Sequence, residues 1–188
     1  MMISERFLII RDLIEITRAT QSEQAVRNVV IAAGFLEKGT QAYHANDLQK
    51  AVTLHEQAIS QLRNVEGVEM LRAMIQSALV ASYARTNRLT EAIANARAAL
   101  PFLTSDPRFS LDRANCMHDL GAALSQCGRL EEAVPCFQEA LAFYEWERGD
   151  AALAKTCRDN LKTVQSVIQA RKKPDQGRRS WWSKLWCV

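Results

Sequence analysis

The segment LGAALSQCGRLEEAVPCFQEALAFY, from Leu120 to Tyr144, carries the spacing that decides the fold. A Leu-Gly pair opens it, and small residues follow at Ala133 and Ala140. The same pair of alanines recurs at Ala92 and Ala99 and again at Ala51 and Ala58, which gives a 41-residue period. Because a fixed period of this length marks a chain built from stacked supersecondary units, the sequence predicts a repeat architecture.

Composition favours an all-α chain of one domain or one short array. The 188 residues include only 7 Gly and 4 Pro, and residues that favour helix dominate. We expect helices at about 4–18, 23–45, 47–64, 66–86, 87–103, 110–126, 130–148 and from 151 to about 171. Gly128 is placed to end a helix in the left-handed conformation, and Pro107 disfavours helix at Asp106.

Charge is divided unevenly along the chain. The net charge is +3, but the residues from Arg171 onward carry +5 and the rest carries −2. A body close to neutral gives no reason to expect nucleic-acid binding.

The cysteines and the N-terminal segment indicate a cytoplasmic protein. Five cysteines without a C-x-x-C pair predict free, mostly buried thiols in a reducing compartment (Cys116, Cys127, Cys136, Cys157 and Cys187). Charged residues interrupt the apolar N-terminal segment, so we expect neither a signal sequence nor a membrane span there.

Residues 120–144 resemble the tetratricopeptide repeat, a pair of helices that approach closely through small residues. The resemblance implies an all-α, right-handed superhelix in which Phe137 fills the space left beside Gly121. Two earlier units match at Gly39, Tyr43, Ala51 and Ala58, and at Leu79, Tyr83, Leu89, Ala92 and Ala99. His55 and Ala96 stand in the register of Phe137, and Val80 replaces the small residue of the second unit.

The period is longer than the roughly 34 residues usual in this family. The seven-residue excess adds about two helical turns, roughly 10 Å, to each pair. Longer periods occur in relatives such as kinesin light chain and many bacterial tetratricopeptide proteins.

The repeats are expected to lie between two caps. Residues 1–21 are expected to form an amphipathic capping helix, and residues 22–171 three repeats with a C-terminal capping helix. Residues 172–188 are expected to form a flexible, basic, Trp-rich tail.

The resemblance implies that the first helix of each pair lines a groove for a peptide or helix of a partner protein. The residues expected there are Glu37, Thr40, Tyr43, His44, Ser77, Arg85, Asn115, His118, Asp119 and Asn160. Asn160, and also Asp119, are candidates to hydrogen-bond an extended peptide backbone, with a solvated polar position as the alternative.

Some relatives clamp a C-terminal carboxylate with basic residues in this groove. Here the corresponding positions hold Leu36, Thr40, Ala78, Asn115 and Asp119. A carboxylate clamp is therefore not expected. No spacing predicts a catalytic triad, a phosphate loop, a cofactor or a metal site, since His118 and Cys116 lie two apart on a helix and point to different faces.

The tail is the second unusual feature. Its residues Arg178, Arg179, Trp181, Trp182, Lys184, Leu185 and Trp186 combine basic charge with three of the four tryptophans. Trp favours the membrane–water interface and basic residues attract anionic lipid, so an interfacial anchor is one interpretation. The alternatives are docking in the chain's own groove, docking on a partner, or an unstructured end.

Taken together, these features predict a non-enzymatic adaptor that binds a protein in its groove and is held at a membrane surface by its tail. The alternative is a small tetratricopeptide chaperone for a secreted or membrane client.

Overall fold

The computed structural model describes residues 2–147 and 149–172. Its α-helices are α1 (Met2–Thr20), α2 (Glu23–His44), α3 (Leu48–Gln61), α4 (Glu69–Arg85), α5 (Leu89–Ser105), α6 (Ser110–Gln126), α7 (Leu130–Ala142) and α8 (Ala151–Lys172). A 3₁₀ turn, η1 (Pro107–Phe109), precedes α6, and a π-helical turn, η2 (Phe143–Glu147), extends α7. These residues contain no strand, so the predicted all-α class is confirmed for the described part of the chain.

The 41-residue period reappears in the helix boundaries. Helices α3, α5 and α7 begin at Leu48, Leu89 and Leu130, which are one period apart. Helices α4, α6 and α8 begin at Glu69, Ser110 and Ala151, with the same step. The repeat read from small residues is therefore a repeat of whole helix pairs.

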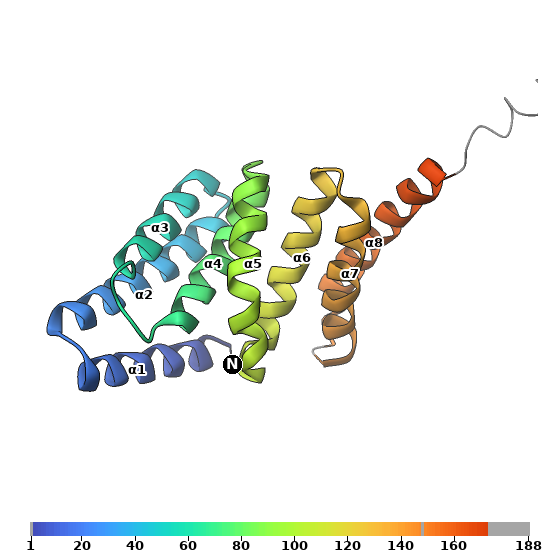
Figure 1. Cartoon of the computed structure of the whole chain (residues 1–188). Helices are drawn as coiled ribbons and strands as arrows, with labels where there is room; N and C mark the ends of the chain where they lie inside the picture. The colour runs from blue at the N-terminus through green and yellow to red at the C-terminus, as the bar shows by residue number, and fades with distance from the viewer. Residues whose placement is uncertain (1, 148, 173–188) are drawn as a thin grey trace, which may run out of the picture.

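The helix pairs stack side by side in chain order (Figure 1). Each pair consists of a first helix (α2, α4 or α6) and a second helix (α3, α5 or α7) packed against it. The first helices also contact one another in sequence, α2 with α4 and α4 with α6, and α8 continues this row by packing on α6 and α7. We call the surface formed by α2, α4, α6 and α8 the first-helix face.

The turn within each pair has one backbone geometry. Asn46, Asn87 and Gly128 occupy the same place in successive periods, with φ of 62°, 61° and 77°. In the third turn the amide N–H of Arg129 donates to the carbonyl of Leu124 at 2.9 Å, which satisfies a carbonyl at the helix end. The left-handed conformation predicted for Gly128 is confirmed, and asparagine, which tolerates it better than most residues, provides the other two.

Close helix approach within a pair depends on matched side-chain sizes. A β-carbon added at Gly121 would lie 3.0 Å from Cε1 of Phe137, so the ring of α7 packs directly on the backbone of α6. In the second repeat the sizes are reversed, because Val80 and Ala96 hold these positions and both are fully buried. The helices stay close because the combined volume of the two facing side chains is small, and not because one particular position is small.

The last described helix, α8, packs on the third pair. Cys157 is buried on α8, and its thiol donates to the carbonyl of Phe137 at 3.2 Å. Lys162 stands one period after Gly121, where another repeat would need a small residue, and its side chain is exposed. A charged side chain at this place leaves no surface for a further second helix.

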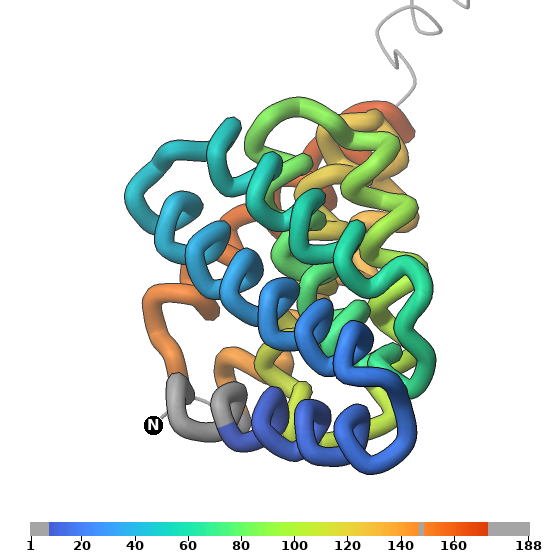
Figure 2. The backbone as a smooth tube through the Cα atoms, turned by 90° about the vertical axis from the view of Figure 1, so that its left-hand side faces the viewer, coloured from blue at the N-terminus to red at the C-terminus, as the bar shows by residue number. Residues whose placement is uncertain are grey.

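The N-terminal helix, α1, belongs to no pair and lies across the ends of the helices that follow it (Figures 1 and 2). Its own residues Ile9 and Thr17 are buried against the stack. Its C-terminal turn is tied down by Gln21, whose side-chain amide donates to the carbonyl of Glu66 at 2.6 Å. Near the middle of α1, Leu8 and Arg11 border a hollow together with Arg108 of η1. Although α1 has the sequence register of a second helix, it closes the side of the stack and does not extend its row.

The end of the third pair differs from the single helix expected over 130–148. Helix α7 gives way to η2, where the wider turn allows the adjacent residues Phe143 and Tyr144 both to pack inward, with ring centroids 6.1 Å apart. Trp146 in the same turn is 84% exposed. None of the described helices is long and apolar enough to cross a bilayer.

Candidate protein-binding face

A cation–aromatic cluster lies where α2 and α4 end. The guanidinium carbon of Arg85 stands 5.1 Å from the ring centroid of Tyr43, and Arg85 also donates to the side-chain oxygen of Asn46. The exposed ring of His44 meets Tyr43 edge-on at 5.8 Å. This cluster brings together three predicted groove residues from two successive repeats.

A second cluster joins α6 to α8. The side-chain amide nitrogen of Asn160 lies 3.2 Å from Nε2 of His118. An amide nitrogen can only donate, so Nε2 accepts and the imidazole proton sits on Nδ1. That nitrogen lies 3.4 Å from the carboxylate of Asp119. His118 thus connects the first helix of the third repeat to the capping helix.

Electrostatics links the two clusters. The pKa of Tyr43 is raised, first by burial and then by the negative charge of Asp119, while Arg85 acts in the opposite direction. A carboxylate on α6 therefore acts on a phenol on α2. The two clusters on the first-helix face therefore interact electrostatically.

The four other predicted groove residues make hydrogen bonds within the fold. Glu37 accepts from the side chain of Gln41 one turn away, and the hydroxyl of Thr40 donates to the carbonyl of Leu36 at 2.9 Å. Ser77 is buried and donates to the carbonyl of Asp112 at 3.5 Å. Asn115 accepts from the hydroxyl of Tyr144 at 2.8 Å. Ser77 and Asn115 thus join helices, which the sequence pattern alone did not reveal.

The predicted tail residues, Arg178, Arg179, Trp181, Trp182, Lys184, Leu185 and Trp186, lie outside the described residues.

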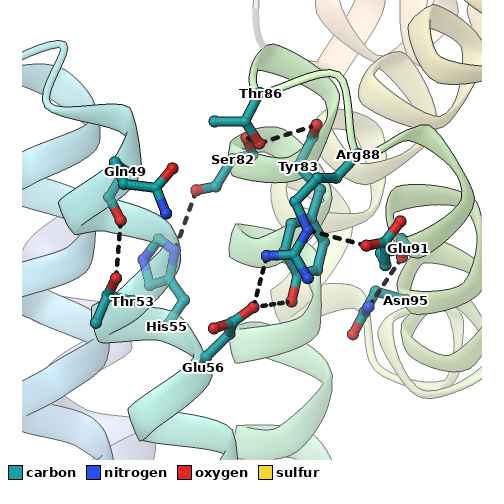
Figure 3. A network of polar contacts seen from close by, with 10 residues as sticks. All are labelled: Gln49, Thr53, His55, Glu56, Ser82, Tyr83, Thr86, Arg88, Glu91 and Asn95. Carbon is teal, nitrogen blue, oxygen red and sulfur yellow. Dashed lines mark hydrogen bonds and ion pairs between the residues drawn. The ribbon is translucent and has the colours of Figure 1, made fainter.

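A polar network that the sequence reading missed fastens the first repeat to the second (Figure 3). The hydroxyl of Tyr83 and the guanidinium of Arg88 both donate to Glu56 at 2.8 Å. Arg88 also donates to Glu91 at 2.9 Å and lies 4.2 Å from the centroid of the Tyr83 ring. Glu56 lies on α3, 27 residues before Tyr83 and 32 before Arg88, so no local sequence pattern revealed the network.

A buried histidine lies beside this network. His55 is 1% exposed, and its Nδ1 lies 3.2 Å from the hydroxyl of Ser82 (Figure 3). That hydroxyl donates to the carbonyl of Ala78 at 3.0 Å, so it accepts from the N–H of His55. Nε2 has no hydrogen-bond partner among the described residues. Burial lowers the pKa of His55 to about 4, which keeps the ring neutral at neutral pH.

Within residues 2–147 and 149–172, no three His, Cys, Asp or Glu side chains gather closely enough to hold a metal ion.

Comparison with known families agrees with this geometry. The tetratricopeptide repeat model matches residues 71–146, which covers α4 to η2 with the second and third helix pairs. Comparisons with curated proteins and with solved structures found no match. Tetratricopeptide repeat domains generally mediate protein–protein interactions. The first pair and α8 continue the 41-residue step on either side of the matched segment. Residues 71–146 are therefore tetratricopeptide repeats.

Proposed function

We propose that this chain is a non-enzymatic adaptor whose first-helix face binds a peptide or helix of a partner protein. The observation that carries the proposal is the presence of two polar clusters on this face, Tyr43 with Arg85, and Asp119 with His118 and Asn160. They offer an aromatic ring, a cation, an anion and an amide, which are the groups that recognise a polypeptide side chain or backbone.

The sparse charge on this face argues against a ligand that is strongly acidic or strongly basic. Arg85 is engaged by Tyr43 and Asn46, and Asp119 by His118. A ligand that relied on charge alone would have to replace these contacts. A peptide that presents its backbone and mixed side chains fits the surface better.

The test is affinity purification with the full chain as bait and mass spectrometry of what it retains. The double variant Tyr43→Ala and Asn160→Ala changes both clusters, and the matched control Gln57→Ala and Gln138→Ala changes exposed residues of α3 and α7. Partners of the first-helix face are retained by the wild type and the control and are lost by the double variant. Retention of every partner by the double variant would refute the binding face.

We further propose that the basic, Trp-rich tail holds the adaptor at an anionic membrane surface, with the repeats on the cytoplasmic side. The support is compositional: Arg178, Arg179 and Lys184 flank Trp181, Trp182 and Trp186. Each basic residue near an anionic surface contributes about 1 kcal/mol, and interfacial tryptophans add apolar burial.

Flotation with phosphatidylcholine vesicles, with and without phosphatidylserine, tests the tail. The full chain is expected to float with the anionic vesicles and a chain ending at residue 173 is not. A variant with Arg178, Arg179 and Lys184 changed to Gln separates charge from the aromatic residues. Equal flotation of the full and shortened chains would remove the anchor.

A further inference from the structure

A small cavity of about 160 Å³ opens on the first-helix face between α6 and α8. Its deep part is apolar, because Phe137 and Val164 line it and both are buried. Gln126 and Thr163, which are exposed, lie at its edge with Asn160. None of the lining residues carries a charge.

Neighbouring residues hold the floor of the cavity in place. The ring of Phe137 lies against the backbone of Gly121, where a β-carbon would come within 3.0 Å of Cε1. On its other side the ring meets His118 edge-on, with centroids 5.6 Å apart. The floor is therefore formed by a side chain that packing fixes before any ligand arrives.

The edge carries an oriented amide. The nitrogen of Asn160 donates to Nε2 of His118 at 3.2 Å, and His118 is itself held by Asp119. With its nitrogen engaged in this way, the side-chain oxygen of Asn160 is the group available to accept a hydrogen bond from a ligand. His118 is thus a positioning residue that sets which end of the amide a ligand meets.

We propose that this cavity receives one aliphatic side chain of the partner peptide that binds the first-helix face, beside the backbone contact expected for Asn160. This rests on the proposed binding function of the first-helix face and names the residue class that the face selects.

Size and charge select this occupant. The volume is well below the roughly 300–1,000 Å³ of pockets that hold small-molecule ligands, so the cavity suits a single side chain. An acidic or basic side chain would lose its hydration here and meet no opposite charge in the lining. A Val, Leu, Ile or Met side chain gains from burial against Phe137 and Val164 without that cost.

The probe is a displayed library of random short peptides, selected on the full chain and then measured individually. We expect the selected peptides to share one aliphatic residue. Ala122 lines the cavity, so Ala122→Phe fills it, and Thr163→Glu sets a carboxylate at its exposed edge. Each variant is expected to weaken binding about tenfold or more. Ala94→Phe, on the exposed side of α5, is the matched control and leaves binding unchanged.

The outcomes separate this inference from the function on which it rests. Selected peptides that bind Ala122→Phe and Thr163→Glu as tightly as the wild type, yet lose binding to Tyr43→Ala, would overturn the cavity and leave the face intact. Peptides whose binding no first-helix variant changes would overturn both. Thermal melting of every variant shows that it folds, and Thr163→Glu keeps the test valid if filling the cavity disturbs the packing of α8.

Discussion

The imidazole of His55 lies directly against the backbone of Gly39, where an added β-carbon would come within 2.4 Å of Cδ2. The pair occupies the same register as Phe137 and Gly121, which lie two periods further along the chain. A histidine thus takes the structural place of a phenylalanine in the first repeat, and it depends on a glycine just as the phenylalanine does.

Substitution of Gly39 by alanine is expected to destabilise the fold by about 1–3 kcal/mol. The new methyl group would overlap a ring in a packed core and push α2 and α3 apart. The matched control is Gly34→Ala in the same helix, where nothing lies within 4 Å of the added carbon. That change should stabilise by about 0.5–1 kcal/mol, since alanine is the better helix former. Urea unfolding of both variants measures the difference, and equal effects would contradict the packing at Gly39.

His55 should make stability depend on pH below neutrality. The pKa of its buried ring is lowered to about 4, against about 6.5 in an unfolded chain. Between these values the unfolded state binds a proton that the native state does not. The contribution of His55 is therefore complete above pH 6.5 and is lost as pH falls towards 4, by up to about 3 kcal/mol.

The variant His55→Phe should remove this loss. Phenylalanine fills the equivalent site in the third repeat, and the hydroxyl of Ser82 would keep its bond to the carbonyl of Ala78. The difference in unfolding free energy between pH 7 and pH 4.5 should shrink by about 2–3 kcal/mol relative to the wild type. Gln57→Ala, at an exposed and uncharged position of the same helix, should leave it unchanged. An unaltered pH dependence in His55→Phe would show that His55 is not the group responsible.

These pairs show why the helices could be predicted and their connections could not. The 41-residue period depends on small residues that every repeat needs, and it correctly indicated the helix pairs. His55 and Ala96 made the repeat harder to recognise because they differ from Phe137, the residue in the same register. What the core requires is the combined volume of two facing side chains on two helices, and one position alone does not show it. The first two repeats therefore matched the family pattern less well than the third, although their helix geometry is the same.

For the candidate binding face, the sequence indicated which residues lie on the first helices but not how these residues contact one another. Helical register brought Tyr43, His118 and Asn160 to the first-helix face. It could not show that Ser77 is buried or that Asn115 is held by Tyr144, because these contacts depend on how neighbouring repeats stack. The cavity above Phe137 escaped the sequence reading for the same reason, since its walls come from three helices.

The turns within the pairs predict a graded response to substitution. Gly128→Ala should cost about 1–2 kcal/mol, because φ is 77° there and alanine resists the left-handed region, while open space around the position excludes a clash. Asn87→Gly, at φ of 61° in the preceding turn, should lie within about 0.5 kcal/mol of the wild type, since glycine relieves the strain but gains freedom in the unfolded chain. Thermal denaturation compares the two, and a stable Gly128→Ala protein would mean that the turn adopts another geometry.

Thiol reactivity should report the packing of the last two repeats. Cys127 is exposed at the end of α6, whereas Cys116, Cys136 and Cys157 are buried. Burial raises the pKa of Cys116 to about 12 and that of Cys157 to about 11, so little thiolate is present to react.

Iodoacetamide at pH 8 should therefore alkylate Cys127 at least about a hundredfold faster than the three buried cysteines in the folded chain. In denaturant all four should react at similar rates. Peptide mass spectrometry follows each site separately, and Cys127→Ser serves as the control that leaves only the slow reactions among these four. Rapid alkylation of Cys157 in the folded chain would mean that α8 separates from α7, which would also remove one wall of the proposed cavity.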